Sequence, residues 1–300
     1  MSENNILKIG TRGSPLALWQ AYEVKKILNN AKIIKIKTTG DKITNQPLSS
    51  IGGKGLFTKE IDKELLNGSI DIAVHSLKDV PTIISDKFNL TCILPRGEIE
   101  DVLISNNNSK NINSLPINST IGTSSPRRYA QIKRIRPDIK ILPIRGNVST
   151  RLNKVKNKEV FATILALAGI KRLNINTAYS ILNYTECMPA ASQGIIGITY
   201  LKNNNKIHKI LNKFLNVETN YQALGERAVL NAINGDCHSP IAVTSVIKKN
   251  KITISAKIFT SDGKKMIEES NTDIIKNAVI VGNRIGKSLI KMGALKLLKL

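Results

Sequence analysis

The segment IGTRGSP around Gly10 is echoed by IGTSSP around Gly122, and this repeat constrains the fold more than any other feature of the sequence. In both copies an apolar run ends in Gly-Thr, and a Ser-Pro pair then begins a helix-like segment. This order is typical of a strand that leads into a helix, with Ser as N-cap and Pro in the first helical turn. The repeat predicts two related α/β domains that face each other across a cleft, with ligands at the carboxyl ends of the strands.

Strand and helix patterns alternate through the first two thirds of the chain. Apolar runs such as ILKIGT and DIAVHSL flank helical segments such as SPLALWQAYEVKKILNN, and the alternation restarts after the polar stretch NNNSKNINS. This alternation predicts an α/β fold with mainly parallel sheets. From about Asn220 a helix, two strand-like runs and a closing helix predict a small α+β domain.

The lysine-rich closing helix has two interpretations. It could lie on a membrane surface, or it could dock against the sheet of its own domain. Apolar residues recur in it at helical spacing, which favours docking. These residues are Val281, Ile285, Leu289 and Met292.

The composition is strongly basic, with 45 Lys plus Arg against 22 Asp plus Glu and a formal net charge of +23. Such an excess usually indicates an anionic partner. The lysines are spread among asparagines and isoleucines, and no helix-turn-helix, zinc-finger or RNA-binding pattern accompanies them, so nucleic-acid binding is disfavoured. Several arginines instead fall in short motifs near predicted strand ends, where they could pair with the carboxylates of a polyanionic ligand. They are Arg12, Arg127, Arg128, Arg145, Arg151 and Arg172.

Cysteine and histidine usage argues against a disulfide framework and against a metal site. Cys92, Cys187 and Cys237 have no paired spacing, which is typical of a reducing compartment. The three histidines form no metal-ligand pattern. Because the sequence shows neither a signal-peptide core nor an apolar run long enough to span a bilayer, we expect a soluble cytoplasmic protein without a membrane partner.

The glycine-rich segment SIGGKGLF does not match a phosphate-binding P-loop. The pattern requires glycine where Leu48 stands and Ser or Thr where Gly55 stands. A mobile loop beside a site and a plain surface turn both remain open for this segment.

The segment DIAVHSLKDVP places Ser76, Lys78 and Asp79 where a buried strand ends. An acid beside a cation at the carboxyl end of a strand is where an α/β enzyme keeps a proton-handling group. An ion-paired surface loop is the alternative for Lys78 and Asp79. His75, inside the apolar run, is expected to be a core residue.

Seven segments of the chain resemble those of one enzyme family, in the same order, from Thr11 to Pro240. They are TRGSPLALWQA, GGKGLFTKE, AVHSLKDVP, GTSSPRR, RGNVSTRL, ALAGIKRL and GDCHSP. The family is hydroxymethylbilane synthase, also called porphobilinogen deaminase. The resemblance implies two periplasmic-binding-protein-like domains, at residues 1–98 with 195–217 and at residues 99–194, and a C-terminal domain at residues 218–300.

The resemblance also implies the activity of a transferase in tetrapyrrole and haem biosynthesis. Four porphobilinogen molecules are condensed head to tail, each losing ammonia, and the linear tetrapyrrole hydroxymethylbilane is released. The implied cofactor is a dipyrromethane, joined to one cysteine by a thioether, and the implied enzyme is a monomer. Because porphobilinogen carries two carboxylates, the growing chain is densely anionic, which would explain the arginines at a helix start.

Carried over by motif, the resemblance makes Asp79 the catalytic acid and Cys237 the covalent anchor of the cofactor. The remaining positions are expected to bind carboxylates or to shape the site. The cofactor-binding group is Ser76, Lys78, Thr123, Ser125, Arg127, Arg128, Arg145 and Gly146. The substrate-binding group is Arg12, Ser14, Arg151, Arg172 and Gln193.

Three places depart from the family pattern. Asp236 stands where a second glycine is common, Ser149 replaces a frequent glycine, and residues 190–194 are less glycine-rich than usual. A carboxylate at Asp236 should disfavour the neighbouring thiolate and slow cofactor attachment. A non-catalytic protein that binds an anionic metabolite in the same cleft is the main alternative, but it would need neither an acid at Asp79 nor an accessible Cys237.

Overall fold

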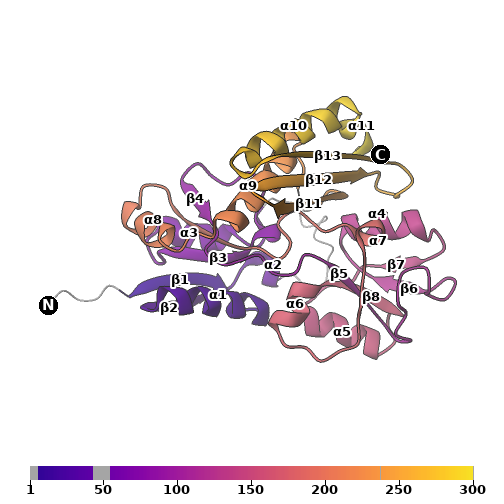
Figure 1. Ribbon diagram of the computed structural model, residues 1–300. Helices are drawn as coiled ribbons and strands as arrows, with labels where there is room; N and C mark the ends of the chain where they lie inside the picture. Colours follow the sequence, from indigo (N-terminus) through magenta and orange to yellow (C-terminus); the bar gives the residue numbers. More distant parts are fainter. Residues whose placement is uncertain (1–5, 43–54, 237, 300) are drawn as a thin grey trace.

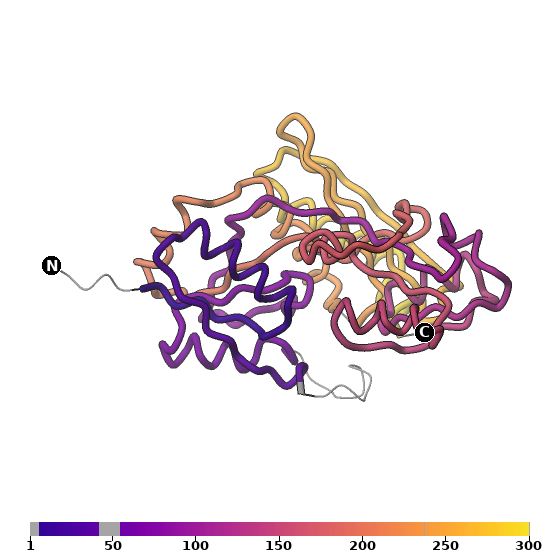
Figure 2. Tube along the Cα trace, turned by 90° about the horizontal axis from the view of Figure 1, so that it is seen from below, coloured from indigo at the N-terminus to yellow at the C-terminus, as the bar shows by residue number. Residues whose placement is uncertain are grey.

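The computed structural model describes residues 6–42, 55–236 and 238–299, which form three parts, each with its own sheet (Figure 1). Two α/β domains lie side by side, and a smaller C-terminal domain covers both on one side (Figure 1, Figure 2). Separate clusters of buried apolar side chains lie in the three parts. The predicted α/β class, with two related domains and a small α+β domain, is confirmed.

The first domain has a five-stranded sheet in the order β2-β1-β3-β10-β4. Its strands are β1 (Leu7–Arg12), β2 (Ala31–Ile36), β3 (Ile72–Ser76), β4 (Phe88–Thr91) and β10 (Ile196–Leu201). Its helices are α1 (Pro15–Leu28), α2 (Thr39–Lys42), α3 (Lys59–Leu66) and α8 (Asn205–Asn212), and the short 3₁₀ turn η2 (Leu77–Asp79) follows β3. Helix α1 packs on this sheet through the fully buried Ala21 and Val24.

The second domain repeats this order as β7-β6-β8-β5-β9. Its strands are β5 (Asp101–Ser105), β6 (Thr120–Gly122), β7 (Lys140–Leu142), β8 (Ala162–Ala166) and β9 (Ser180–Ile181). Its helices are α4 (Pro126–Ile135), α5 (Val148–Lys156), α6 (Leu167–Arg172) and α7 (Tyr184–Cys187). Strands β6, β7 and β8 take the places of β1, β2 and β3, as the repeated Gly-Thr and Ser-Pro motif predicts.

Both sheets are mixed, whereas the sequence predicts mainly parallel ones. In the first domain β1 runs parallel to β2 and β3, but β10 is antiparallel to β3 and β4. In the second domain β6 is parallel to β7 and β8, but β5 is antiparallel to β8 and β9. The antiparallel strands β5 and β10 are reached by chain crossings between the domains, and an apolar run does not reveal strand direction.

The two predicted helix starts are confirmed. The Ser14 hydroxyl accepts a hydrogen bond from the Ala17 N–H at 3.3 Å, and Pro15 begins α1. The Ser125 hydroxyl likewise accepts from the Arg128 N–H at 3.4 Å at the start of α4. Each serine satisfies one of the otherwise unpaired N–H groups of the first turn, which fixes where the helix begins.

The C-terminal domain packs its helices on a three-stranded antiparallel sheet. Its elements are α9 (Val217–Ala232), β11 (Ile241–Lys248), β12 (Lys251–Phe259), β13 (Met266–Ile274), η3 (Ile275–Asn277), α10 (Ala278–Lys291) and α11 (Ala294–Leu297). Val281, Ile285 and Leu289 of α10 are fully buried in this domain's core, which confirms docking, whereas Met292 is exposed. Strand β13 was not predicted because its sequence, MIEESNTDI, is largely polar.

Two chain segments, residues 92–100 and 188–195, cross between the α/β domains, and we call them the crossing segments. They touch closely, because the Gly97 N–H donates to the Gly194 carbonyl at 3.0 Å. Gly194 has a φ of +84°, and a Cβ there would lie 2.5 Å from the Gly97 oxygen. Only glycine fits this left-handed position and close approach.

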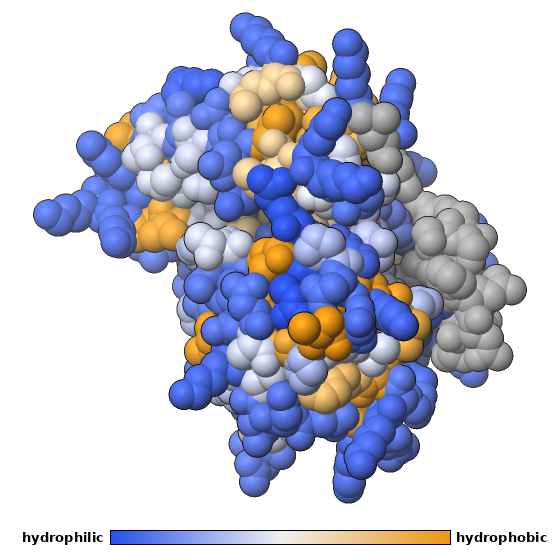
Figure 3. All heavy atoms as spheres, turned by 90° about the vertical axis from the view of Figure 1, so that its right-hand side faces the viewer, coloured by the Kyte–Doolittle hydropathy of each residue, from blue (hydrophilic) through white to orange (hydrophobic). Residues whose placement is uncertain are grey.

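Figure 3 shows one face of the molecule, on which hydrophilic side chains project separately and apolar atoms form scattered spots. On this face the apolar spots do not merge into one continuous patch. Within the described residues, no helix combines the length and the apolar character needed to cross a membrane.

Candidate active site

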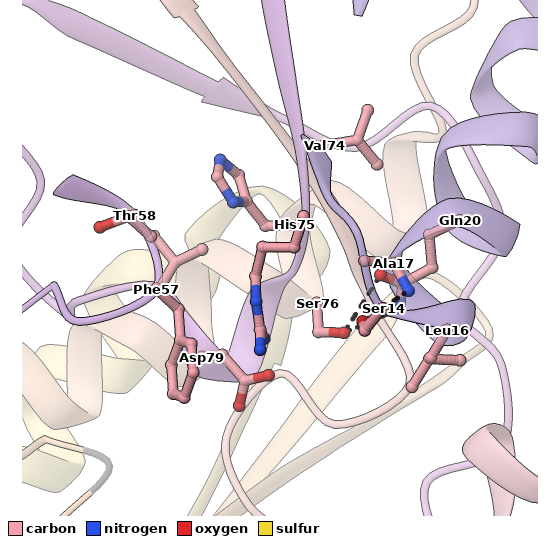
Figure 4. Close-up of a pocket in the computed structure, with 12 residues that line it drawn as sticks. Ser14, Leu16, Ala17, Gln20, Phe57, Thr58, Val74, His75, Ser76 and Asp79 are labelled. Atoms are coloured by element: carbon pink, nitrogen blue, oxygen red, sulfur yellow. Dashed lines mark hydrogen bonds between the residues drawn. The ribbon is translucent and has the colours of Figure 1, made fainter. Parts of the chain in front are cut away.

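Four of the predicted site residues line one cavity in the first domain (Figure 4). Arg12, Ser14, Ser76 and Asp79 form part of its wall, and its volume is about 80 Å³. Gln20 also lines it, and its side-chain amide exchanges hydrogen bonds of 2.8 and 3.1 Å with the Ser76 hydroxyl. The cavity lies where β1 and β3 end and α1 begins, the place where α/β sheets bind ligands.

Arg12 is a firmly oriented cation at this cavity. Its guanidinium pairs with both carboxylate oxygens of Asp41, with a shortest N–O distance of 2.5 Å, and lies 4.1 Å from the centre of the Phe57 ring. The hydroxyl of Thr38 donates to the same carboxylate at 2.7 Å. Burial alone would raise the pKa of Asp41, but Arg12 and Thr38 hold it below its usual value.

Asp79 has a carboxylate without a hydrogen-bonding partner among residues 6–42, 55–236 and 238–299. It is partly exposed and lines the cavity on the side of Phe57 (Figure 4). Lys78 and Arg151 are near enough for the charge of Asp79 to favour their protonated forms. A carboxylate that faces a cavity, with cations nearby but no fixed partner, is suited to exchange protons with a ligand.

Lys78 is connected to the second domain through Gln193. The Lys78 ammonium donates to the Gln193 side-chain oxygen at 3.3 Å. The Gln193 amide nitrogen donates to the carboxylate of Asp101 at 3.0 Å and to the Ile99 carbonyl at 2.7 Å. Gln193 is fully buried and uses both ends of its amide here, so its contacts bridge the domains rather than line the cavity.

Arg127 and Arg128 share one buried counter-ion, Asp101. Each guanidinium approaches a different oxygen of this carboxylate at 2.7 Å, and both arginines are only 5% exposed. Arg127 also donates to the Met188 carbonyl at 2.6 Å, and Arg128 donates to the Ile164 carbonyl at 2.8 Å. Burial alone would raise the pKa of Asp101, but the two arginines hold it far below its usual range.

Thr123 and Ser125 contribute through the turn that leads into α4. The Thr123 hydroxyl accepts a hydrogen bond from the Ser125 N–H at 3.2 Å, and Ser125 caps the helix. These bonds fix the backbone of the first turn of α4, which carries Arg127 and Arg128.

Arg151 extends the basic group along α5. Its side chain donates to the Gly146 carbonyl at 3.0 Å. Gly146 has a φ of +105°, a left-handed conformation that favours glycine. Burial lowers the pKa of Arg151 to about 10, and the charges of Arg128 and Arg145 add to this effect.

Arg172 lies against the crossing segments and outside the cavity wall. Its guanidinium donates to the Gly194 carbonyl at 2.6 Å and lies 5.4 Å from the centre of the Trp19 ring. Since Trp19 belongs to α1 and Arg172 to α6, this contact joins the two α/β domains.

Cys237 lies outside the described residues, but the residues on either side of it are described. The Asp236 carboxylate accepts hydrogen bonds from the His238 N–H at 2.9 Å and from the Ser239 hydroxyl at 3.1 Å. The unusual aspartate at this position therefore closes a turn in the chain.

The other unusual segments have contrasting surroundings. Ser149 is exposed on α5, where a side chain has room. In residues 190–194, the buried Ser192 donates its N–H to Glu226 of the third domain at 2.6 Å. Gly52, Gly53 and Lys54 of the glycine-rich segment lie outside the described residues.

The charges around this site fit an anion-rich cofactor. The charged groups that shift the pKa values of Lys78 and Arg151, together with these two residues, include more cations than carboxylates. The five cations are Lys78, Arg127, Arg128, Arg145 and Arg151, and the two carboxylates are Asp79 and Asp101. A partly desolvated group with this excess of positive charge is stabilised by bound carboxylates. In the part of the chain that the structure describes, no group of three or more His, Cys, Asp or Glu side chains could hold a metal ion.

Sequence reasoning missed several residues that organise the site. Asp101 and Asp41 neutralise predicted arginines, and Gln20 binds Ser76. In addition, Arg96 of a crossing segment pairs with the buried Glu226 of α9 at 2.5 Å. The sequence does contain one indication, because Asp101 is an acid at the start of the apolar strand DVLIS. It does not show with which arginines this acid forms an ion pair.

The surroundings of Lys78 predict a pH-dependent effect on stability. Burial lowers the pKa of Lys78 from 10.5 to about 8, and the charges of Arg128 and Arg127 add to this effect, while Asp79 and Asp101 oppose it. The charged lysine therefore costs stability below about pH 8, and the cost disappears as the pH rises toward 10.5. The test is urea unfolding of cofactor-free Cys237→Ala protein with and without Lys78→Met. Between about pH 8 and pH 10.5, the free energy of unfolding of the Lys78→Met variant should fall relative to that of its parent. A difference that does not change with pH would contradict the prediction.

Two family models and several known proteins match the chain over most of its length. The family model described as porphobilinogen deaminase, dipyromethane cofactor binding domain, matches residues 7–209, and the model of the porphobilinogen deaminase C-terminal domain matches residues 221–291. The porphobilinogen deaminase of Vesicomyosocius okutanii is 41% identical over 99% of both chains. That of Campylobacter fetus is 39% identical over 98% of this chain and 97% of the relative.

Relatives from plants and more distant solved structures are also similar to the chain. The chloroplastic porphobilinogen deaminase of Pisum sativum is 42% identical over 95% of this chain and 81% of the relative. A solved ancestral arginine-binding protein is 16% identical, with a TM-score of 0.40 over 69% of this chain and 89% of its own. The family models and the near-complete matches at about 40% identity establish the conclusion that the chain belongs to the porphobilinogen deaminase family.

Proposed function

We propose that this chain condenses four porphobilinogen molecules head to tail, with loss of ammonia at each step, and releases hydroxymethylbilane. The observation that carries the proposal is the carboxylate of Asp79, which lines a cavity beside Arg12 and near Lys78 and Arg151 without a hydrogen-bonding partner in the described chain. The acid can therefore act on a substrate whose carboxylates the surrounding cations bind.

Asp79 is the proposed proton-handling group. Departure of ammonia from porphobilinogen requires a protonated amine and leaves an electron-poor pyrrole cation. The carboxyl group of Asp79, when protonated, can pass its proton to the amine. The carboxylate that this leaves can stabilise the cation and later accept the proton released when the new bond forms. The Arg12 guanidinium, held by Asp41, lines the same cavity and is placed to bind a substrate carboxylate.

The proposed cofactor site uses Cys237 as its covalent anchor. The dipyrromethane, when bound, supplies the pyrrole end to which substrate units are added. Ser76, Lys78, Thr123, Ser125, Arg127, Arg128, Arg145 and Gly146 are the proposed residues around it. Among them, the cations offer N–H donors to its carboxylates, and Asp101 keeps Arg127 and Arg128 charged and oriented.

The proposed substrate group has members in two settings. Arg12 and Ser14 line the cavity, and Arg151 is electrostatically coupled to Asp79. Arg172 instead contacts the crossing segments, and Gln193 joins one of them to the other. We propose that both act by holding the domains around the substrate.

We further propose that the enzyme is a cytoplasmic monomer with a small anionic substrate. Cys92 and Cys187 are free, buried thiols, in keeping with a reducing compartment. The site draws its residues from the domains of a single chain, which supports a monomer. Light scattering across a range of protein concentrations measures the oligomeric state directly.

Intact-mass measurement tests the proposal. Protein made in a host that produces porphobilinogen should be heavier than the bare polypeptide by two linked pyrrole units, and the Cys237→Ala variant should lack this addition. Cys92→Ala and Cys187→Ala should keep it, because both thiols are buried. An unmodified mass for the parent protein, or an adduct on Cys237→Ala, would contradict the assignment of the anchor.

A further inference from the structure

Arg227 of α9 makes an unusual set of contacts for a buried arginine. It is 9% exposed, and its guanidinium donates to three consecutive carbonyls, those of Val80 at 3.3 Å, Pro81 at 2.5 Å and Thr82 at 2.8 Å. These carbonyls directly follow Asp79 in the chain. One side chain of the third domain therefore binds the backbone of the three residues that follow the proposed catalytic acid.

A structural ion pair does not explain Arg227. Among the residues that the structure places, no carboxylate lies within salt-bridge distance of it. Burial lowers its pKa to about 10, and the Cys92 thiol is the group that opposes this shift. The neighbouring Glu226 is instead bound to Arg96. Burying a guanidinium without a counter-ion is costly, and the three backbone carbonyls are the acceptors that offset this cost.

A second contact joins the same backbone to the segment after α9. The Thr82 hydroxyl donates to the carbonyl of the buried Gly235 at 2.8 Å. Gly235 comes two residues before the proposed anchor, Cys237. Residues 80–82 are thus held at two points by a helix and by the segment to which that helix leads.

The chain before Asp79 is also fixed. The Leu77 N–H donates to the Ile195 carbonyl at 3.0 Å, and the fully buried Leu77 side chain packs with Ala223 of α9. Asp79 is therefore a partly exposed residue between two anchored stretches, both in contact with α9. Such support is what fixes a side chain within the narrow range of positions that proton transfer requires.

We propose that Arg227 is a positioning residue, which sets the place of Asp79 relative to the chain segment that leads to the cofactor anchor. The inference rests on the proposed function, because it takes Asp79 as the acid. It adds that the third domain, besides carrying the anchor, orients the acid of the first domain through hydrogen bonds to residues 80–82.

Kinetics of Arg227→Met holoenzyme test the proposal. We expect kcat to fall about 10- to 100-fold, as displacement of a catalytic group by a fraction of an ångström can cause, with KM changed less than about threefold. Intact mass should still show the adduct. Arg227→Lys keeps a positive charge but has no planar guanidinium to bind three carbonyls. Compared with Arg227→Met, it should regain more of the parent's folding stability than of its kcat. Thr82→Val, which removes the other contact with little change of volume, should lower kcat in the same direction.

Arg134→Met is the matched control. Arg134 of α4 also donates to a carbonyl of the third domain, that of Lys264, at 3.1 Å, but the contact is exposed and is not part of the backbone around Asp79. Its kcat should stay within about twofold of the parent, because such exposed contacts contribute little.

A double-mutant comparison separates positioning from a purely structural role. If Arg227 acts through Asp79, then Asp79→Asn with Arg227→Met should turn over no more slowly than Asp79→Asn alone. Independent, multiplicative losses would overturn the inference, as would a normal kcat in soluble, adduct-bearing Arg227→Met. The proposed function fails separately, if the parent protein itself carries no adduct and releases no ammonia from porphobilinogen.

Discussion

Asp79→Asn is expected to lower the rate of ammonia release from porphobilinogen by about 10²- to 10⁴-fold, the usual contribution of a positioned acid or base. Asparagine has nearly the same shape, so the η2 turn and the cavity wall should be retained. It can neither pass on a proton nor carry the negative charge that stabilises a pyrrole cation. The measurement is a single-turnover assay on holoenzyme, with intact mass to show that the adduct is still present.

Two further variants make this result specific. Asp79→Glu keeps the charge but moves it by one methylene, so it should retain more activity than Asp79→Asn. Asp86→Asn removes an exposed carboxylate seven residues further along the chain. Within the described residues its side chain accepts a hydrogen bond from the Ser85 hydroxyl alone, so the rate should stay unchanged. If Asp79→Asn released ammonia at nearly the parent rate, the proton would be handled elsewhere, and Asp79 would be part of an ordinary surface loop.

The local elements of the fold could be predicted because their causes are local. Ser14 and Ser125 cap the helices that their Ser-Pro motifs predicted, and the apolar spacing of α10 placed Val281 and Ile285 in the core. The mixed sheets could not be predicted in the same way. Strands β5 and β10 obtain their direction from the crossing segments, so their pairing depends on contacts between residues far apart in the sequence.

The candidate site shows the same division between local and distant causes. The motif at Asp79 predicted an acid at the end of β3, and the structure places it at a cavity with Arg12. The motif at Arg127 and Arg128 predicted cations for a ligand, but not that Asp101 already binds both of them. That carboxylate comes from another strand, and only tertiary packing brings it to the start of α4.

Asp101→Asn should destabilise the protein strongly, by about 3 to 5 kcal/mol, because it leaves buried cations without their counter-ion. Asp101 is fully buried and is bound by Arg127 and Arg128, and Gln193 and the Cys187 thiol also donate to it. An asparagine would keep the shape but lose the charge. Urea unfolding at neutral pH measures the difference.

Asp138→Asn is the matched control, since Asp138 also pairs with an arginine of the second domain, Arg136 at 2.6 Å, but both side chains remain partly exposed. Water reaches part of that pair, so its loss should change the free energy of unfolding less than the loss of the fully buried Asp101. A destabilisation of the same size in the two variants would show that burial of the charge is not what matters.

The effect of Asp101→Asn should also depend on pH, with a sign that follows from its pKa. The arginines hold the pKa of Asp101 below its unfolded value of 3.8, so its stabilising contribution is complete above that pH and is lost as the pH falls further. The difference in the free energy of unfolding between the parent and Asp101→Asn should therefore be constant near neutral pH and should decrease in acid. If Arg127 and Arg128 bind the cofactor as we propose, its carboxylates supply further negative charge to them in the holoenzyme, and the difference should be smaller there than in cofactor-free Cys237→Ala protein. An equal difference in the two forms would mean that Arg127 and Arg128 serve Asp101 alone and do not bind the cofactor.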